Sequence, residues 1–103
     1  MTRHWHTVLL ALLVMSVSAR AETVFVKYAG LVDLDKFSCK TVTRSSLVRR
    51  VCYRPDNYMV ILLGSTYYHY CNIPSSEVAG LLYAESMGRY YNAYIKGRYD
   101  CRR

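Results

Sequence analysis

Four cysteines in a short chain constrain the fold more than any other feature of this sequence. The chain has 103 residues, and its cysteines are Cys39, Cys52, Cys71 and Cys101. An even number of cysteines indicates paired thiols, provided that the protein reaches an oxidising compartment. The first question is therefore whether the chain is exported.

The N-terminal segment has the three parts of a secretory signal peptide. Arg3 precedes an apolar run of ten residues from Val8 to Val17, and an Ala-Arg-Ala tripeptide ends at Ala21, just before Glu22. This pattern predicts cleavage after Ala21. The apolar run is well short of the roughly 20 residues that cross a bilayer, which argues against a retained membrane helix. We therefore expect a periplasmic or secreted protein with no membrane span in its mature form.

Cleavage changes the composition that matters for function. Removing 21 residues from 103 leaves 82, and these carry all eleven tyrosines, all seven acidic residues and twelve of the fourteen Lys and Arg residues. The mature net charge is then +5, which favours contact with polyanions or acidic proteins without selecting among them. His69 is the one histidine left, so a site built on several histidines is excluded from the mature chain.

Export favours two disulfides over a metal site. The 12, 18 and 29 residues between successive cysteines lack the short paired spacing of structural zinc ligands, and we predict no metal site and no cofactor. Four cysteines allow three connectivities. We favour Cys39 with Cys52 and Cys71 with Cys101, because the first two stand symmetrically about Ser45 and Ser46, as cross-strand partners would.

Three β-prone runs predict an antiparallel meander in the middle of the chain. The runs are residues 46–53, 58–63 and 66–70, and turn residues separate them at Arg54-Pro55-Asp56-Asn57 and Gly64-Ser65. Val48 and Val51 are three residues apart rather than two, so either a bulge lies between them or the strand period is wrong there. An earlier run, Thr23 to Tyr28, predicts a further edge strand.

After Pro74 the apolar period changes to nearly four, which predicts two short helices. Ser75 or Ser76 is expected to cap the first helix and Ser86 the second, and Gly97 is expected to end the second. The spacing predicts that Met87, Tyr91, Tyr94 and Ile95 share one helix face. The predicted fold class is α+β: a three-stranded antiparallel β-meander followed by two short helices packed on one face, with an N-terminal extension that can add an edge strand.

The part of the chain from Ser45 to Tyr99 resembles the KTSC domain, a small module that also occurs at the C-terminus of some lysyl-tRNA synthetases. The matching features are Ser45-Ser46, Tyr53 with Pro55, Tyr68-His69-Tyr70, Ile73-Pro74, Leu81-Leu82, Ala84, Ser86-x-Gly88, Arg89-Tyr90-Tyr91-Asn92, Ile95 and Tyr99. The resemblance implies a sheet-plus-helix fold and the RNA binding suggested for this family. The predicted organisation is a signal peptide at 1–21, an N-terminal extension at 22–44 and a KTSC-like domain at 45–103.

Tyrosines and cations alternate near the C-terminus. The cations are Arg89, Lys96, Arg98, Arg102 and Arg103, and Tyr90, Tyr94 and Tyr99 lie between them. Cations with aromatic rings form single-stranded nucleic-acid grooves, but the same composition also forms a solvated helix end. Asn92 has the same two interpretations, as a ligand contact or as an amide that holds the two helices together.

The strand Thr66–Tyr70 sends alternate side chains to opposite faces of the sheet. We expect Tyr68 and Tyr70 to pack under the helices and Tyr67 and His69 to be exposed. A lone histidine without a nucleophile or an orienting partner argues against an enzyme.

The sequence thus predicts a small exported, non-enzymatic binding module for nucleic acid or another polyanion. The alternative is a structural or inhibitory envelope protein that docks a single protein partner. The candidate ligand-binding residues are Tyr67, His69, Arg89, Tyr90, Asn92 and Arg98.

Overall fold

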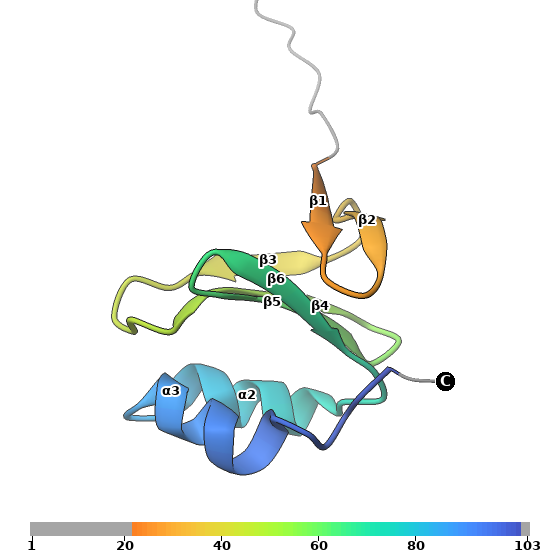
Figure 1. Ribbon diagram of the computed structural model, residues 1–103. Coiled ribbons are helices and arrows are strands. Elements are labelled where there is room, and N and C mark those ends of the chain that lie inside the picture. The colour runs from red at the N-terminus through yellow and green to blue at the C-terminus, as the bar shows by residue number, and fades with distance from the viewer. Residues whose placement is uncertain (1–21, 102–103) are drawn as a thin grey trace, which may run out of the picture.

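A computed structural model describes residues 22–101 of the chain. The predicted signal peptide, Arg102 and Arg103 lie outside the described residues. The described part is a six-stranded mixed sheet followed by helices, so the α+β fold class is confirmed. The sheet has more strands than the predicted three-stranded meander with one added edge strand. Figure 1 shows three layers, with the helices on one side of the central strands and a β-hairpin on the other.

The central strands form the expected antiparallel meander. They are β4 (Val48–Arg54), β5 (Tyr58–Leu63) and β6 (Thr66–Tyr70). Asn57 in the first turn and Gly64 in the second have positive φ values of 65° and 64°, the backbone region that these two residue types tolerate best. The two predicted turns are therefore confirmed.

A β-bulge explains the irregular spacing in β4. The register of β4 against β5 shifts between Val48 and Arg50, which turns one residue out of the normal alternation. Val48 and Val51 consequently both reach the core on the helix side of the sheet. Of the two interpretations that the sequence left open, the bulge is confirmed.

The N-terminal extension contributes three strands rather than one edge strand. They are β1 (Thr23–Val26), β2 (Gly30–Asp33) and β3 (Ser38–Thr41), and the sheet order is β2-β1-β6-β5-β4-β3. β1 is not at an edge, because it lies between β2 and β6, parallel to β6 at the single pair Val26–Tyr67. β3 pairs antiparallel with β4 at the opposite edge.

The β1–β2 hairpin leaves β6 after that single pair and covers the face of the sheet opposite the helices (Figure 1). Val26 and Leu34 from the extension form a small core there with Cys52 and Val60 from the central strands. The central strands are therefore apolar on both faces because both faces are covered. Tyr67, predicted to be exposed, is half-buried against this second core.

The larger core lies between the sheet and the helices α2 (Ser75–Tyr83) and α3 (Met87–Tyr90), the latter continuing into a π-helical turn, η1 (Tyr91–Ile95). The predicted serine cap of the first helix is wrong: Pro74 is the N-cap residue, with no side-chain cap bond. The second cap is confirmed, since Ser86 Oγ accepts a hydrogen bond from Arg89 N–H.

The π-helical turn corrects the predicted helix face. Lys96 N–H donates to Tyr91 O, a five-residue step that is wider than an α-helical turn. Tyr91 and Ile95 are both buried, whereas Tyr94 turns outward and is 53% exposed. Gly97, with a φ of 77°, follows the helix as predicted.

Two disulfides tie the extension and the C-terminal segment to the sheet. Cys39 of β3 is bonded to Cys52 of β4, and Cys71, just after β6, is bonded to Cys101. These are the pairs that the sequence favoured. Cys71 N–H also donates to Tyr99 O at 2.7 Å, which holds the C-terminal segment beside the end of β6.

Candidate functional site

Exposed cations gather on the outer side of α3 and η1. Burial of Met87, Tyr91 and Ile95 against the sheet leaves the opposite side of this helical segment in solvent. The exposed charged, amide and aromatic residues there and just beyond, which we call the basic helix surface, are Arg89, Asn92, Tyr94, Lys96 and Arg98. The sequence from Met87 to Tyr99 contains three cations and no acidic residue, so this surface attracts anions.

The tyrosines next to two of these cations are half-buried and are anchored to α2. Tyr90 Oη donates to Glu77 Oε2 at 2.5 Å, and Tyr99 Oη donates to Glu77 Oε1 at 3.0 Å. We call this arrangement the Glu77 clamp. The hydrogen bond to the carboxylate raises the pKa of Tyr90 to about 12, so its hydroxyl stays protonated and donating. The clamp fixes the backbone that carries Arg89 and Arg98, each one residue before an anchored tyrosine.

The clamp requires a glycine on α2. A Cβ built on Gly80 would lie 2.2 Å from Tyr90 Oη and 2.8 Å from Tyr90 Cζ, far inside van der Waals contact. The Tyr90 ring thus crosses α2 directly over Gly80 to reach Glu77. Tyr94 lies against the same ring, with the two ring centroids 4.7 Å apart. Tyr94, the aromatic residue of the basic helix surface, therefore packs on a ring that Glu77 holds in place.

Tyr67 belongs to a different network on the other side of the sheet. Arg50 Nη1 donates to Tyr67 Oη at 3.0 Å and to Glu22 Oε2 at 2.8 Å, and Arg50 Nη2 donates to Glu22 Oε1 at 2.8 Å. The hydrogen bonds from Arg50 to Glu22 lower the pKa of Glu22 and keep its carboxylate ionised. Arg50 thus fastens Glu22, just before β1, to β4, and the Tyr67 hydroxyl is a second partner of the same guanidinium.

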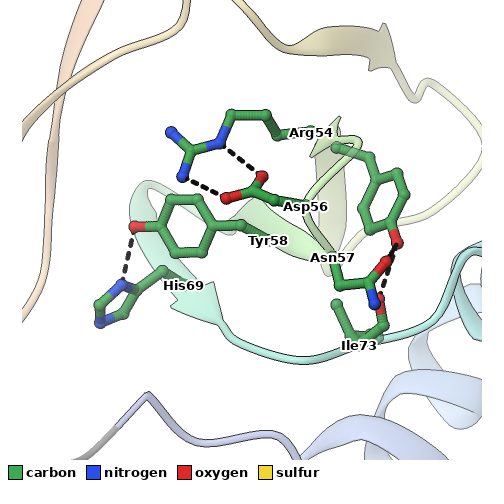
Figure 2. A network of polar contacts seen from close by, with 7 residues as sticks. Arg54, Asp56, Asn57, Tyr58, His69 and Ile73 are labelled. Carbon is green, nitrogen blue, oxygen red and sulfur yellow. Dashed lines mark hydrogen bonds and ion pairs between the residues drawn. The ribbon is translucent and has the colours of Figure 1, made fainter.

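His69 lies in a row of aromatic and charged side chains on that same face. Figure 2 shows the His69 ring against Tyr58, whose Oη is 2.9 Å from His69 Nδ1, and Arg54 held by Asp56 beside them. The Arg54 guanidinium lies over both the Tyr58 ring and the Phe37 ring, with centroid distances of 4.8 Å and 5.1 Å. His69 is half-buried rather than exposed, because the extension covers this face.

His69 also lines a cleft of about 450 Å³ at the end of β6, which we call the β6 cleft. The other lining residues are Lys27, Tyr28, Tyr68, Tyr70, Asp100 and Cys101. Lys27 Nζ lies 5.3 Å from the centroid of the Tyr28 ring and 5.9 Å from that of Tyr68. The lining contains one cation, Lys27, and one carboxylate, Asp100, so the β6 cleft attracts anions less strongly than the basic helix surface does.

Burial of His69 gives a prediction for stability against pH. Desolvation lowers the pKa of His69 in the folded protein, whereas an unfolded chain keeps the ordinary histidine value of about 6.5. The unfolded state therefore binds more protons as the pH falls, and stability that is full above about pH 6.5 is lost as the pH drops toward the folded pKa. Urea denaturation followed between about pH 7.5 and 5.5 is expected to show this decline.

His69→Gln is the matched control for that decline. It keeps a polar side chain but does not titrate, so its stability is expected to stay nearly level over the same interval. Glu22, the other group whose lowered pKa was described above, titrates below its ordinary value of 4.5 and does not enter this interval. Parallel pH profiles for the two proteins would show that His69 is not the source of the decline.

The structure divides the six predicted ligand-binding residues among three places. Arg89, Asn92 and Arg98 lie on the basic helix surface, Tyr90 lies beneath it in the Glu77 clamp, and Tyr67 and His69 lie on the opposite side of the sheet. Asn92 is exposed, and Tyr90, rather than an amide, connects the two helices. Sequence reasoning placed Tyr94 and Lys96 in the run of alternating cations and tyrosines but did not include them among the candidate ligand-binding residues. It also passed over Lys27 and Tyr28, because they belong to the extension.

Neither a clustered metal site nor a membrane helix occurs within residues 22–101. No group of three or more His, Cys, Asp or Glu side chains there is placed to hold a metal ion. No helix in the same range is long and apolar enough to span a bilayer.

Comparison with known proteins identifies the C-terminal half of the chain. Residues 44–99 match the model of the KTSC domain. The chain is also similar to the crystal structure of a KTSC domain protein from Yersinia pestis, with 29% identity and a TM-score of 0.58 over 65% of this chain and 96% of that one. No match was found among curated protein sequences. More than half of the chain thus matches the family model, so this protein belongs to the KTSC domain family.

Proposed function

We propose that this protein is an exported, non-enzymatic binding module that engages a polyanion, such as a single-stranded nucleic acid, through the basic helix surface. The observation that carries the proposal is the composition of that surface: three exposed cations and the exposed ring of Tyr94, with no acidic residue between Met87 and Tyr99. Cations can track a phosphate backbone while an aromatic ring stacks on a base.

The Glu77 clamp supports this proposal. A flexible helix end would lose side-chain and backbone entropy on binding, which weakens affinity. Here the hydrogen bonds from Tyr90 and Tyr99 to Glu77 hold the segment that bears the cations before any ligand arrives. The nearest tyrosines therefore serve as supports, and Tyr94 is left as the stacking residue.

Binding to single-stranded RNA, single-stranded DNA and heparin across a salt series tests the proposal. The logarithm of the affinity is expected to fall linearly with the logarithm of the salt concentration. Arg89→Ala and Arg98→Ala are each expected to lower that slope by about 0.7 and to weaken binding about equally for different sequences.

Lys36→Ala is the matched control for these variants. It removes one positive charge from an exposed position between β2 and β3, within the extension, and is expected to change the slope little. The polyanion proposal fails if none of the three ligands binds in a salt-dependent way, or if Lys36→Ala weakens binding as much as Arg89→Ala does.

We propose a periplasmic or secreted location on two grounds, the signal-peptide pattern and the two disulfides. Mass spectrometry of the protein from intact cells, fractionated by compartment, tests this location. The expected product begins at Glu22 and carries no free thiol. An uncleaved chain with four thiols in the cytoplasm would contradict it.

A second function, docking of a single envelope protein, is favoured by an apolar pair on the β1–β2 hairpin. Phe25 and Leu31 are opposite each other in the register and are 66% and 75% exposed. Affinity capture from an envelope extract with the normal protein and with Phe25→Ser separates this function from polyanion binding. One stoichiometric partner that resists nuclease and salt and is lost with Phe25→Ser would support it.

A further inference from the structure

A second hollow lies far along the sheet from the β6 cleft, between β3 and the end of α2. It has a volume of about 370 Å³, and we call it the β3 groove. Its lining comes from residues 40–44, at the end of β3 and just beyond it, and from Leu82, Tyr83 and Met87. Val42, Leu82 and Met87 give it an apolar floor, and Tyr83, which is 87% exposed, stands at its side.

The wall of the β3 groove is a free sheet edge. β3 is the last strand in the sheet order, so its outer side has no neighbouring strand among residues 22–101. Val42 N–H donates to Arg49 O at 2.9 Å, which makes Val42–Arg49 a hydrogen-bonded pair. In an antiparallel ladder, hydrogen-bonded and non-hydrogen-bonded pairs alternate. The residues of the pairs Thr41–Arg50 and Cys39–Cys52 are therefore not joined by backbone hydrogen bonds. The short Cα–Cα distance of 4.0 Å between Cys39 and Cys52 agrees with this assignment.

The alternation fixes where the free hydrogen-bonding groups of β3 point. In a pair that is not hydrogen-bonded, the backbone N–H and C=O point away from the partner strand. Cys39 and Thr41 therefore present these groups along the outer edge of β3, and Thr41 does so within the lining of the β3 groove. Such a row of donors and acceptors is a template for an added strand.

Both ends of this edge are held rigidly. The disulfide between Cys39 and Cys52 locks one end of β3 to the sheet. Beyond the other end, Arg44 Nη2 donates to Leu82 O at 2.8 Å and Arg44 Nη1 donates to Glu85 O at 3.4 Å, which joins the chain to the end of α2. A ligand strand would meet an edge that needs little further ordering.

Charge indicates what kind of strand fits. The lining carries the two cations Lys40 and Arg44, and none of the described residues that line it is acidic. We propose that the β3 groove binds an extended, acidic segment of another protein by strand addition to β3, with alternate side chains packed on Val42, Leu82 and Tyr83. This interaction uses a surface separate from the basic helix surface and extends beyond the proposed function.

Fluorescence anisotropy with short labelled peptides of alternating glutamate and valine tests the proposal on the exported chain with both disulfides formed. A peptide of the same sequence with alternate backbone amides methylated keeps its charge and loses the donors of a strand. It is expected to bind about tenfold more weakly or worse. A peptide with lysine in place of glutamate is expected not to bind.

Variants of the protein test the same interaction by changing the β3 groove instead of the peptide. Lys40→Glu is expected to abolish binding of the acidic peptide, whereas Lys36→Glu, the same charge change in the extension, is expected to preserve it. Thr41→Pro removes an outward N–H that the β3–β4 ladder does not use and is also expected to abolish binding. Arg89→Ala, on the basic helix surface, is expected to leave binding of the acidic peptide unchanged.

Three results would each overturn the proposal: no binding of the acidic peptide, equal binding of the methylated peptide, or normal binding by Lys40→Glu. Loss of peptide binding with Arg89→Ala rather than Lys40→Glu would likewise overturn it, since it would assign the contact to charge on the basic helix surface. The methylated peptide is tested on the unchanged protein, so the conclusion does not depend on whether Thr41→Pro folds.

Discussion

Replacing both Cys71 and Cys101 with serine is expected to lower the free energy of unfolding by about 4 kcal/mol. The disulfide closes a loop with a sequence separation of 30, and its removal lets the unfolded chain explore many more conformations. The folded chain also loses the bond that keeps the C-terminal segment beside β6. In urea denaturation the midpoint should fall sharply while the native spectrum is retained at low urea.

The Cys39–Cys52 pair supplies the comparison for this prediction. Its sequence separation is only 13, so replacing both of its cysteines is expected to cost about 3 kcal/mol by the same chain-entropy argument. A loss of less than about 1 kcal/mol for Cys71→Ser with Cys101→Ser would contradict the expectation. It would mean that the backbone bond from Cys71 to Tyr99 and the bond from Tyr99 to Glu77 hold the segment without the disulfide.

Gly80→Ala is expected to destabilise the protein by about 2 kcal/mol, although alanine is the better helix former. The new Cβ would occupy the space of Tyr90 Oη and Cζ, so the ring must leave α2 and its hydrogen bond to Glu77 is lost. Thermal unfolding followed by circular dichroism measures the loss of stability. Because the Glu77 clamp holds the backbone next to Arg89, the affinity of the protein for a polyanion is expected to fall in the same variant.

A double-mutant cycle makes this prediction specific. With Tyr90→Ala the obstacle is gone, and adding Gly80→Ala is expected to stabilise that background by about 1 kcal/mol, the usual gain from glycine to alanine within a helix. The change of sign is the diagnostic result. Ala79→Ser, at the exposed neighbouring position, is expected to change stability little. A loss from Gly80→Ala that is the same in both backgrounds would show that Tyr90 is not the cause.

The meander could be predicted from the sequence because its signals are local. The β-prone runs at 58–63 and 66–70 coincide with β5 and β6, and the turns before and after β5 contain residues that accept positive φ. The bulge in β4 was visible as a three-residue spacing between Val48 and Val51. Local turn chemistry and side-chain period were sufficient for this part of the fold.

One strand of the extension, β1, lies within the run predicted at Thr23 to Tyr28, but β2 and β3 could not be predicted in the same way. β2 and β3 have four residues each, and β3 is mostly polar, so neither shows a usable period. What stabilises them is distant in sequence: β3 pairs with β4, and the hairpin packs Val26 and Leu34 on Cys52 and Val60. Such contacts leave no trace within a short window.

The candidate site was predicted in part for a related reason. Cations at Arg89 and Arg98 are easily read from the sequence as surface residues, and they are exposed. The role of Tyr90 could not be read in this way, because its partner Glu77 is 13 residues away on another helix and the space for its ring depends on Gly80. The residues next to Tyr90 in the sequence do not show whether its side chain supports the helix or contacts a ligand.

The double covering of the central strands has a consequence for how the protein can be divided. The match to the KTSC domain begins at residue 44, yet Cys52 and Val60 are fully buried only because residues 22–43 lie over them. A truncated protein that starts at residue 44 would expose the apolar face of the central strands and leave β4 as an unpaired edge strand. We expect a fragment of residues 44–103 to aggregate while residues 22–103 stay monomeric in size-exclusion chromatography, which would make the folding unit longer than the part that matches the family.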